Sequence, residues 1–337
     1  MDALHSFEVI RPKTVDEALA ARIAHRHSRM IGGGTDLLVN IRRRIETPSV
    51  LIDTSDLTDL KTIDHGDTGL SIGASVRLFE VAEHPNIQHF YPAIAQAAGS
   101  IAGPTHRNMG TVGGNLCLDT RCIYYNQSEW WREANDHCLK TELGDMCHVA
   151  PKSKGVCFAT YSGVLAPALM LFGAEIDLLG PDGERTVAMR DFYIGRSRQD
   201  GSKGDGINYM AIKPGEFVVR VRASSPGRLV SGYDKIRIRR SIEYPVAGCA
   251  AALTRDDDTL TDIRIAFTGT NPRPVFLEGT ADLAGSTLSD SVLEGIDNLC
   301  KDQLMSMKTT FTPGHYRRRV ATQMAKRLVG RLFNAAG

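Results

Sequence analysis

The chain has 337 residues, of which 42% are hydrophobic and 23% are charged, and its formal net charge is +1. This length exceeds the roughly 250–300 residues at which a single core stops growing, so we expect two or three packed subdomains. The near-neutral charge excludes a basic field for nucleic acid or a membrane surface. No apolar run approaches the ~20 residues of a spanning helix. The first residues do not resemble a signal peptide, so we expect a cytoplasmic protein.

Hydrophobic periodicity and turn residues divide the first two thirds of the chain into short helices and strands. In chain order we predict a helix over 14–24 that opens with a capping box, a strand over 28–31, a helix over 37–42, a strand over 50–52, a hairpin over 61–73, helices over 78–83 and 93–102, a helix from 166, a hairpin over 174–188 and a strand over 216–221. We expect residues 1–224 to form the first domain, with subdomains of about 1–57 and 58–224, because residues 224–227 form a turn-rich boundary.

The last third, residues 225–337, changes character. Strands are predicted over 231–239, 246–253 and 263–267, and two helices over 287–300 and 315–333. Consecutive strands followed by helices indicate an antiparallel sheet with helices on one face, so the fold class is α+β.

Two glycine turns are candidate cofactor sites. The first, Ile31–Asp36, lies between a predicted strand and a predicted helix, where backbone N–H groups can point into one concavity that suits a pyrophosphate. It matches neither the dinucleotide GxGxxG pattern nor a Walker motif. The second turn, Asn108–Asn115, adds Thr111 and Asn115 as hydrogen-bonding side chains. A tight turn is the simpler reading of either loop, but two such loops can hold one long cofactor from both sides.

Five of the seven cysteines lie between Gly110 and Cys157, which is typical of a metal site rather than a disulfide framework. The gaps between Cys122, Cys138, Cys147 and Cys157 are 15, 8 and 9 residues, without the close pairs of zinc ribbons or bacterial ferredoxins. Spacing alone therefore leaves an iron–sulfur cluster, a mixed zinc site with His137 or His148, and structural cysteines all open. The aromatic residues of this loop supply apolar surface to shield a cluster; they are Tyr124, Tyr125, Trp130 and Trp131.

Cys249 and Cys300 stand alone in apolar surroundings and are predicted to be small buried hydrophobes. Alternation places Lys235, Arg237 and Arg239 on one strand face, and we assign Lys235 to an anionic cofactor. The arginine run over 316–319 is predicted to be a solvated surface. No nucleophile–base pair is evident, so we predict no catalytic residue and interpret the chain as an electron carrier.

The two glycine signatures, Gly32–Leu37 and Gly110–Leu116, resemble those of the FAD-binding subunits of the molybdenum hydroxylase, or xanthine oxidase, family. The similarity extends over nearly the whole chain. It implies an FAD-binding domain built from two α/β subdomains and a C-terminal flavoprotein domain with an antiparallel sheet and helices.

The resemblance implies a set of FAD-contacting residues at the matching positions. These are Ile31, Gly32, Gly33, Gly34, Thr35, Asp36, Ile101, Thr111, Gly114, Asn115, Asp119, Val218 and Lys235. The chain departs from the family at Val164, where an acidic residue commonly contacts FAD.

Residues 119–160 form an insert that most of the family lacks. The run around Cys122, together with Tyr125–Arg132, is similar to the insert in the beta subunits of the 4-hydroxybenzoyl-CoA reductase group, which carries a [4Fe–4S] cluster. The resemblance implies four cluster ligands, which are Cys122, Cys138, Cys147 and Cys157. Cys117 matches a cysteine that is not a ligand.

This resemblance also implies partners and a reaction. A large molybdopterin-binding subunit and a small subunit with two [2Fe–2S] clusters complete the enzyme, which is expected to be a dimer of heterotrimers. Electrons would enter from reduced ferredoxin at the [4Fe–4S] cluster and pass through FAD to molybdenum, where 4-hydroxybenzoyl-CoA becomes benzoyl-CoA. Two alternatives stay open. One is the flavoprotein of an outward-running molybdenum hydroxylase, and the other is a non-redox scaffold that binds FAD and zinc.

Overall fold

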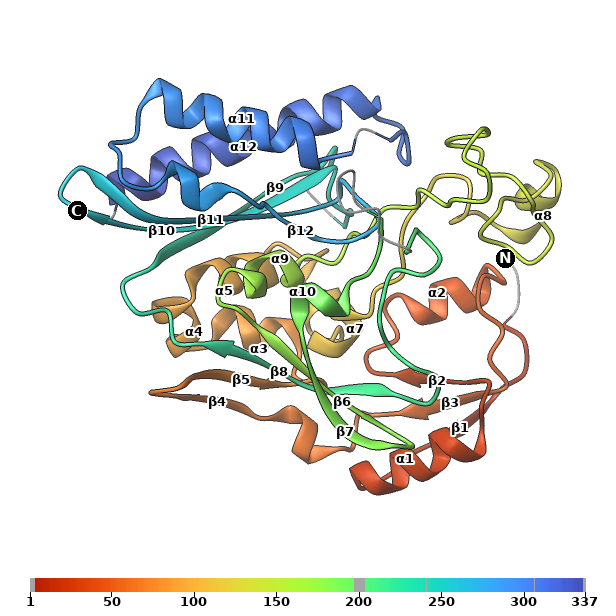
Figure 1. The fold of residues 1–337 in the computed structure, drawn as a ribbon. Coiled ribbons are helices and arrows are strands. Elements are labelled where there is room, and N and C mark those ends of the chain that lie inside the picture. Colours follow the sequence, from red (N-terminus) through yellow and green to blue (C-terminus); the bar gives the residue numbers. More distant parts are fainter. Residues whose placement is uncertain (1–3, 197–203, 240–241, 306, 336–337) are drawn as a thin grey trace.

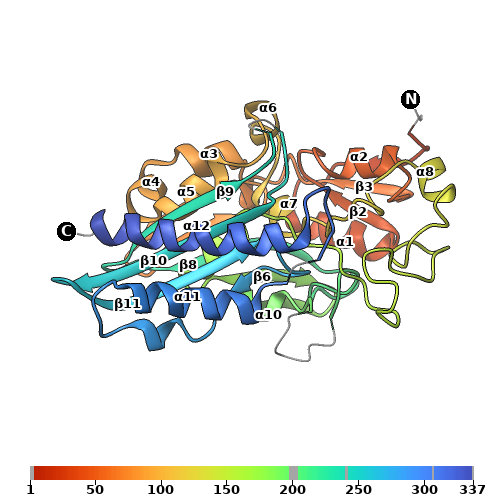
Figure 2. The same ribbon diagram turned by 90° about the horizontal axis from the view of Figure 1, so that it is seen from above.

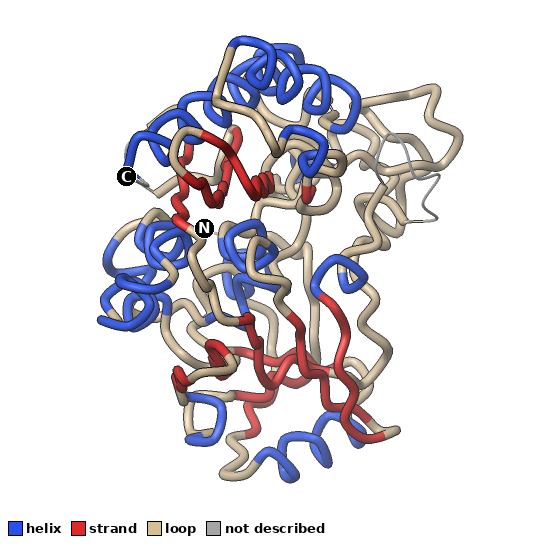
Figure 3. Tube along the Cα trace, turned by 60° about the vertical axis from the view of Figure 1, so that its left-hand side comes forward, coloured by secondary structure: helices blue, strands red, loops and turns tan. Residues whose placement is uncertain are grey.

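Three β-sheets form the framework of the computed structural model, which describes residues 4–196, 204–239, 242–305 and 307–335. Two of them lie side by side, and the third is stacked over them with a layer of helices in between (Figure 1). Seen from another side, helical and strand layers alternate from the C-terminal helices at one end to the N-terminal helix at the other (Figure 3). None of the helices in these described ranges is long and apolar enough to cross a membrane.

The N-terminal unit is a small parallel sheet of order β1-β3-β2 with a helix on either side. Its elements are β1 (Glu8–Ile10), α1 (Val15–Ala24), β2 (Ser28–Ile31), α2 (Leu37–Arg42) and β3 (Val50–Asp53). Thr14 caps α1 as predicted, because its side chain accepts a hydrogen bond from the backbone N–H of Glu17 at 3.1 Å. Parallel pairing places the end of β2, and with it the first glycine turn, at the carboxyl edge of this sheet.

The second unit is an antiparallel sheet of order β4-β5-β8-β6-β7. Its strands are β4 (Ile63–Gly66), β5 (Gly69–Gly73), β6 (Glu175–Gly180), β7 (Gly183–Ala188) and β8 (Phe217–Ser224), and the 3₁₀ turn η1 (Thr58–Lys61) leads into it. β8 lies in the centre and pairs with both predicted hairpins, so residues about 150 positions apart in the chain close one sheet.

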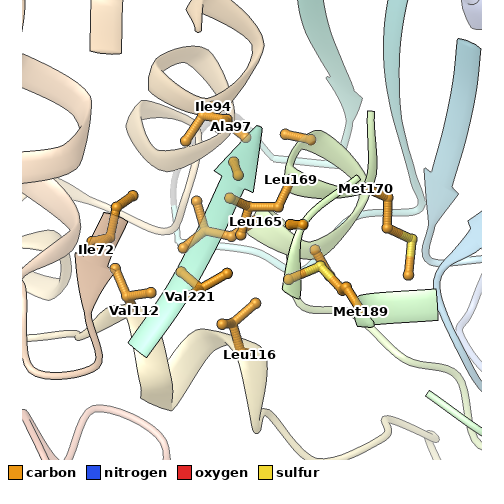
Figure 4. Packing of buried hydrophobic residues seen from close by; sticks show 14 of the residues in the cluster. Ile72, Ile94, Ala97, Val112, Leu116, Leu165, Leu169, Met170, Met189 and Val221 are labelled. Atoms are coloured by element: carbon orange, nitrogen blue, oxygen red, sulfur yellow. The ribbon is translucent and has the colours of Figure 1, made fainter. Parts of the chain in front are cut away.

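A layer of short helices covers this sheet. It consists of α3 (Leu78–Glu83), α4 (Pro85–Phe90), α5 (Pro92–Gly99), α6 (Pro104–Arg107), α7 (Val112–Leu116), α9 (Leu165–Met170) and α10 (Met189–Phe192). Side chains from β5, β8, α5 and α9 meet in the main core, as Ile72, Val221, Ile94 and Leu165 illustrate (Figure 4). The α7 helix, which carries the second glycine turn, packs against β5 and β8, so the core fixes the position of that turn.

The C-terminal unit is an antiparallel sheet of order β12-β11-β10-β9 with two helices on one face. Its elements are β9 (Val230–Ile236), β10 (Ala247–Asp256), β11 (Thr259–Thr268), β12 (Val275–Phe276), η2 (Thr280–Leu283), α11 (Asp290–Gln303) and α12 (Gly314–Ala335). The long α12 helix runs over β9 and β10 (Figure 2). The predicted fold class is therefore confirmed.

Both faces of β10 are buried, and its residues alternate between two cores. Ala250 and Ala252 join the main core against the helical layer, whereas Cys249 and Ala251 pack toward α11 and α12. Cys249 and Cys300 are each 0% exposed, which confirms that they are small buried hydrophobes. Because the main core continues into the C-terminal sheet, the last third of the chain is held firmly on the rest.

Sequence patterns missed some elements and misplaced some side chains. The short strand β1 and the helix α4 were not predicted. β9 ends at Ile236, so Arg237 and Arg239 lie beyond the strand and do not share a strand face with Lys235. The predicted solvated arginine run is also wrong at Arg317, which is 1% exposed.

Candidate functional site

The two glycine turns lie directly against each other. A Cβ atom on Gly33 would come within 1.8 Å of the backbone oxygen of Met109, and one on Gly32 within 2.8 Å of Thr111 Oγ1. Only glycine fits at such an approach of two backbones. Gly34 needs the same freedom for a second reason, since its φ of +67° lies in the left-handed region. The structure therefore brings the two predicted loops together as one feature.

The first turn offers unused hydrogen-bond donors. Within the described part of the chain, the backbone N–H groups of residues 32–36 donate to no other residue. The second turn differs, because its N–H groups already have partners within the protein: Gly113 donates to Ala74 O at 2.8 Å and Gly114 to Thr111 Oγ1 at 3.2 Å. A cluster of free backbone N–H groups at a glycine turn fits an anionic group such as a pyrophosphate. The first loop thus supplies donors, and the second loop supports it.

Asp36, at the end of the first turn, is already engaged by three side chains. Its carboxylate pairs with Arg121 and accepts hydrogen bonds from Tyr244 OH at 2.8 Å and from Asn40 Nδ2 at 2.9 Å. The Arg121 guanidinium also lies 4.5 Å from the centre of the Tyr244 ring. Three distant segments therefore meet at the first loop: the N-terminal unit, the cysteine insert and the C-terminal unit.

Lys235 is bonded to the backbone at the end of α5, at the residue that precedes Ile101. Lys235 Nζ donates to Ser100 O at 3.0 Å, and Arg237 donates to the same oxygen at 3.3 Å. Burial and, to a smaller extent, the nearby charge of Arg237 together lower the pKa of Lys235 to about 8. A partly desolvated ammonium group with one carbonyl partner is suited to an anionic ligand.

Lys235→Met is expected to stabilise the FAD-free chain at pH 7 by about 1–2 kcal/mol, because it removes a buried charge at the cost of one hydrogen bond. Because this pKa is lowered, the unfolded chain binds more protons at this residue than the folded chain between the folded pKa of about 8 and the ordinary lysine pKa of 10.5. The free energy of unfolding of the wild type therefore increases with pH through that window, and the stability difference between variant and wild type becomes smaller. Urea unfolding at pH 7 and pH 10 measures this, with the exposed Lys61→Met as control. A difference that is equal at both pH values would contradict the prediction.

The other predicted contacts occupy varied positions. Asn115 is 7% exposed, and its Oδ1 accepts from the backbone N–H groups of Val164 at 3.1 Å and Leu165 at 3.0 Å, so it fixes the start of α9. Val164 is 3% exposed and packs in the main core. Val218, on β8, is 7% exposed and belongs to the same core. Asp119 turns toward the insert, where its carboxylate pairs with Lys140 Nζ at 2.5 Å.

The insert leaves the body of the protein at a closed base and lies at one end of the molecule, with the helix α8 (Glu129–Glu133) in it (Figure 1). Arg121 N donates to Thr160 O at 2.7 Å, and Thr160 N returns a bond to Arg121 O at 2.8 Å. These two bonds pair the ends of the predicted 119–160 insert. The residues between them form a loop whose geometry the body of the protein fixes at both ends.

Four cysteines line one small cavity in the insert: Cys122, Cys138, Cys147 and Cys157. Tyr124, Tyr125, Lys140 and His148 lie in the same wall. Cys117 does not line it and packs instead against the main core. Trp130, predicted to shield this region, is 66% exposed and does not. The four cysteines that line this cavity are the four that the resemblance implies, and their role as ligands stays a prediction.

Burial dominates the electrostatics of the cavity. It raises the pKa of Cys122 to about 11 and that of Cys157 to about 12, and it raises the pKa of Cys138 as well. In the described ranges, no group of three or more His, Cys, Asp and Glu side chains is placed so that it could hold a metal ion. The four thiols therefore surround a shared space rather than converge on one point.

This arrangement can be tested against the two metal chemistries that fit four thiols. A structural zinc ion needs four ligands at about 2.3 Å from one centre. In a [4Fe–4S] cluster each thiolate binds a different iron atom, so the ligands stand around the cluster. Four thiols that line one cavity are the donor set that such a cluster takes.

Comparison with known proteins identifies the family. Residues 5–223 match the family described as the FAD binding domain in molybdopterin dehydrogenase, and residues 232–332 match the CO dehydrogenase flavoprotein C-terminal domain. The chain belongs to this family. It is an FAD-binding subunit of the molybdenum hydroxylase type, as the glycine signatures predicted.

Curated relatives match this flavoprotein along nearly its whole length. It is 36% identical over 312 residues to the nicotinate dehydrogenase FAD-subunit of Eubacterium barkeri, covering 90% of this chain and 88% of that protein. It is 29% identical to the aldehyde oxidoreductase FAD-binding subunit of Escherichia coli, covering 96% and 98%. The carbon monoxide dehydrogenase medium chain of Afipia carboxidovorans is 28% identical, with coverage of 97% and 96%.

Solved structures show the same fold. A chain of reconstituted CO dehydrogenase from Oligotropha carboxidovorans superposes with a TM-score of 0.78 at 24% identity, covering 98% of this flavoprotein and 99% of that chain. A chain of quinoline 2-oxidoreductase from Pseudomonas putida 86 gives a TM-score of 0.77 at 20% identity, with 99% coverage of each.

Sequence reasoning missed three residues of the flavoprotein site, namely Arg121, Lys140 and Tyr244. Lys140 is the clearest, since its ammonium group contacts Asp119, Thr120 and the Tyr125 ring inside the cavity wall. All three make their contacts with residues from other parts of the sequence; Tyr244 and its partner Asp36, for example, are 208 positions apart. Only the position of Lys140, two residues after Cys138, gave a local signal.

Proposed function

We propose that this flavoprotein is the FAD- and [4Fe–4S]-binding subunit of a molybdenum-containing aryl-CoA reductase. Its enzyme would remove the phenolic hydroxyl group of 4-hydroxybenzoyl-CoA and give benzoyl-CoA. The observation that carries the proposal is the cavity lined by four cysteines in an insert that is joined to the first glycine loop. An FAD-binding subunit without a second redox centre has no use for four buried thiols around one space.

The proposal assigns FAD to the joined glycine loops. Residues 31–36 would hold the pyrophosphate through the open N–H groups of residues 32–36, and Thr111 and Gly114 of the second loop would support them. Lys235 would neutralise an anionic part of the cofactor next to Ile101. Three further residues would support the cofactor site indirectly. Asn115 fixes the start of α9, Val218 packs in the main core, and Asp119 pairs with Lys140. Bound FAD supplies electron-transfer chemistry that the side chains alone cannot.

The proposal assigns the cluster to the insert. Cys122, Cys138, Cys147 and Cys157 would be its ligands, and a bound [4Fe–4S] cluster supplies one-electron transfer. Lys140 places a positive charge in the cavity wall, and its partner Asp119 lies two residues before Arg121, which pairs with Asp36 of the first loop. A short run of this chain thus links the cysteine cavity with the proposed FAD site.

The proposal includes partners and organisation. The catalytic site would lie on a molybdopterin-binding large subunit, a small subunit would carry two [2Fe–2S] clusters, and reduced ferredoxin would be the donor. The cytoplasmic enzyme would be a dimer of such heterotrimers. Within this chain, residues 1–224 would form the FAD-binding domain and residues 225–337 the C-terminal domain.

A second function is favoured by the 36% identity to a nicotinate dehydrogenase FAD-subunit. In that case the flavoprotein would serve an outward-running hydroxylase, which takes electrons from its substrate. The zinc scaffold has less support, because the insert lacks the closely spaced cysteine pairs of zinc ribbons.

The complex purified without oxygen tests these functions together. Iron, zinc and FAD are measured first, and turnover is then assayed with 4-hydroxybenzoyl-CoA and reduced ferredoxin, and separately with nicotinate and an electron acceptor. We expect about four iron atoms per chain beyond those of the [2Fe–2S] subunit, and turnover only in the first assay. Nicotinate oxidation would establish the second function, and one zinc without extra iron would establish the scaffold.

A further inference from the structure

Arg317 is a buried cation that reaches from the C-terminal unit to the base of the cysteine insert. It lies in the first turn of α12 and is 1% exposed. Its Nη1 donates to Thr309 Oγ1 at 2.6 Å and to Thr160 Oγ1 at 3.2 Å, and its Nη2 donates to Thr310 Oγ1 at 2.9 Å. The guanidinium is therefore held entirely by neutral hydroxyl groups.

No carboxylate compensates this charge among the residues that the structure describes. Arg317 forms no ion pair there, and its Nε has no hydrogen-bond partner. Lys140 differs in this respect, because its buried ammonium group pairs with the carboxylate of Asp119. A buried charge without a counter-ion is strongly unfavourable, so the protein needs a negative charge close by.

The residues around Arg317 hold the backbone of Cys122. Arg121 exchanges two backbone hydrogen bonds with Thr160, and Ile123 N donates to Thr309 O at 3.0 Å. Both neighbours of Cys122 are thus bonded to a threonine that the guanidinium contacts. Burial lowers the pKa of Arg317 to about 10, and Cys122 acts on that pKa in the opposite direction. Arg317 is therefore connected through Thr160 and Thr309 to the backbone on both sides of Cys122, which lines the cavity.

Metal binding would supply the missing negative charge. Ligand cysteines bind iron as thiolates, and four thiolates carry more negative charge than the inorganic core of a [4Fe–4S] cluster carries positive charge. The loaded site as a whole is therefore an anion, and one-electron reduction adds one further negative charge. Arg317 would then be a cation close to that anion, because the threonines that it contacts are bonded to both neighbours of Cys122.

We propose that Arg317 is the counter-ion of the metal–thiolate site, so that it stabilises the loaded insert on α12 and favours the reduced state of the cluster. The inference rests on the proposed function, because it needs the cluster. Arg317 touches neither the cluster ligands' thiols nor a substrate in the described contacts, so it is a positioning residue that acts through charge.

Three variants of the full chain in its complex test this. Arg317→Met removes the charge and keeps much of the volume, Arg317→Lys keeps the charge, and Arg319→Met removes an exposed charge from the same helix turn. Each is purified anaerobically, and iron content and FAD content are measured. The midpoint potential of the cluster is obtained by titration with dithionite, a one-electron donor in solution.

We expect Arg317→Met to lose part of its iron and to keep FAD. The midpoint potential of the cluster that remains should be lower than in the wild type. Half-reduction should therefore need about a tenfold higher ratio of reduced to oxidised donor, which corresponds to a decrease of about 59 mV for a one-electron couple. Arg317→Lys should keep most of the wild-type potential, and Arg319→Met all of it. An Arg317→Met protein with full iron and an unchanged potential would overturn the inference.

Metal-free protein gives a second readout. Without a cluster, Arg317 has no counter-ion, so metal-free Arg317→Met should be at least as stable to heat as metal-free wild type. If this variant is less stable or does not fold, Arg317 is a structural residue and the inference fails. The two proposals can be distinguished. A wild-type chain without iron in the insert would overturn the cluster itself. A wild-type chain with full iron, together with an Arg317→Met variant whose potential is unchanged, would overturn only the role of Arg317.

Discussion

Cys138→Ala is expected to abolish iron binding in the insert and to leave FAD bound. The thiol of Cys138 lines the cavity, and a cluster that loses one of four protein ligands loses much of its binding energy. The fold around residue 138 does not depend on that thiol, because its backbone oxygen accepts the two local hydrogen bonds, from Thr141 N and Thr141 Oγ1, each at 2.8 Å. Iron analysis and the flavin absorption of the anaerobic complex measure both outcomes.

Cys117→Ala is the matched control for this variant. Cys117 lies in the same stretch of chain but packs against the main core, so its loss should leave the iron content at the wild-type level. It should cost only about 1 kcal/mol of stability through lost packing. Equal iron in Cys138→Ala and wild type would rule out Cys138 as a ligand, and loss of iron in the Cys117 variant would show that the wrong four cysteines were chosen.

The local features of this protein could be predicted because their causes are local. Thr14 caps α1 through a residue three positions away, and the hairpin around residues 61–73 follows from alternating apolar residues on either side of a turn. The glycine turns were recognisable for a similar reason, since three consecutive glycines have few uses other than a close backbone approach. Such signals lie within one short window of sequence.

Contacts between distant segments could not be predicted in the same way. The run of residues 316–319 looks like an exposed basic surface, yet Arg317 is buried because three threonines from other segments enclose it, one of them 157 positions away. Trp130 gives the opposite error, since an aromatic side chain next to cysteines suggested a shield and is exposed. In both cases burial is decided by packing between units, which composition and periodicity do not encode.

The same limit applies to the site. Spacing alone left a cluster, zinc and structural cysteines open, because gaps of 15, 8 and 9 residues impose no geometry. The fold adds a geometry: a base closed by Arg121 and Thr160, a shared cavity, and Cys117 excluded from it. Lys140 places a positive charge in the cavity wall, and only the tertiary structure brings Arg317 to Thr160 at the base of the insert.

Gly33→Ala is expected to have the largest effect of any single methyl group added to the first loop. The new Cβ would lie 1.8 Å from Met109 O and 2.2 Å from the Met109 carbonyl carbon, both of them backbone atoms that cannot rotate away. The two glycine loops must therefore move apart, at a cost of about 3 kcal/mol or more. Because the open N–H groups belong to the displaced loop, FAD affinity should decrease at least about 100-fold, the equivalent of roughly 3 kcal/mol.

Gly66→Ala separates this steric effect from the general effect of replacing a glycine. Gly66 ends β4, and a Cβ there would meet nothing within 4 Å. This variant should keep wild-type FAD affinity and gain up to about 0.5 kcal/mol of stability from the lower entropy of the unfolded chain. Fluorescence titration with FAD and urea unfolding of both variants measure the contrast. Wild-type FAD affinity in Gly33→Ala would mean that the contact between the loops does not shape the cofactor site, and that the pyrophosphate must bind elsewhere on the chain.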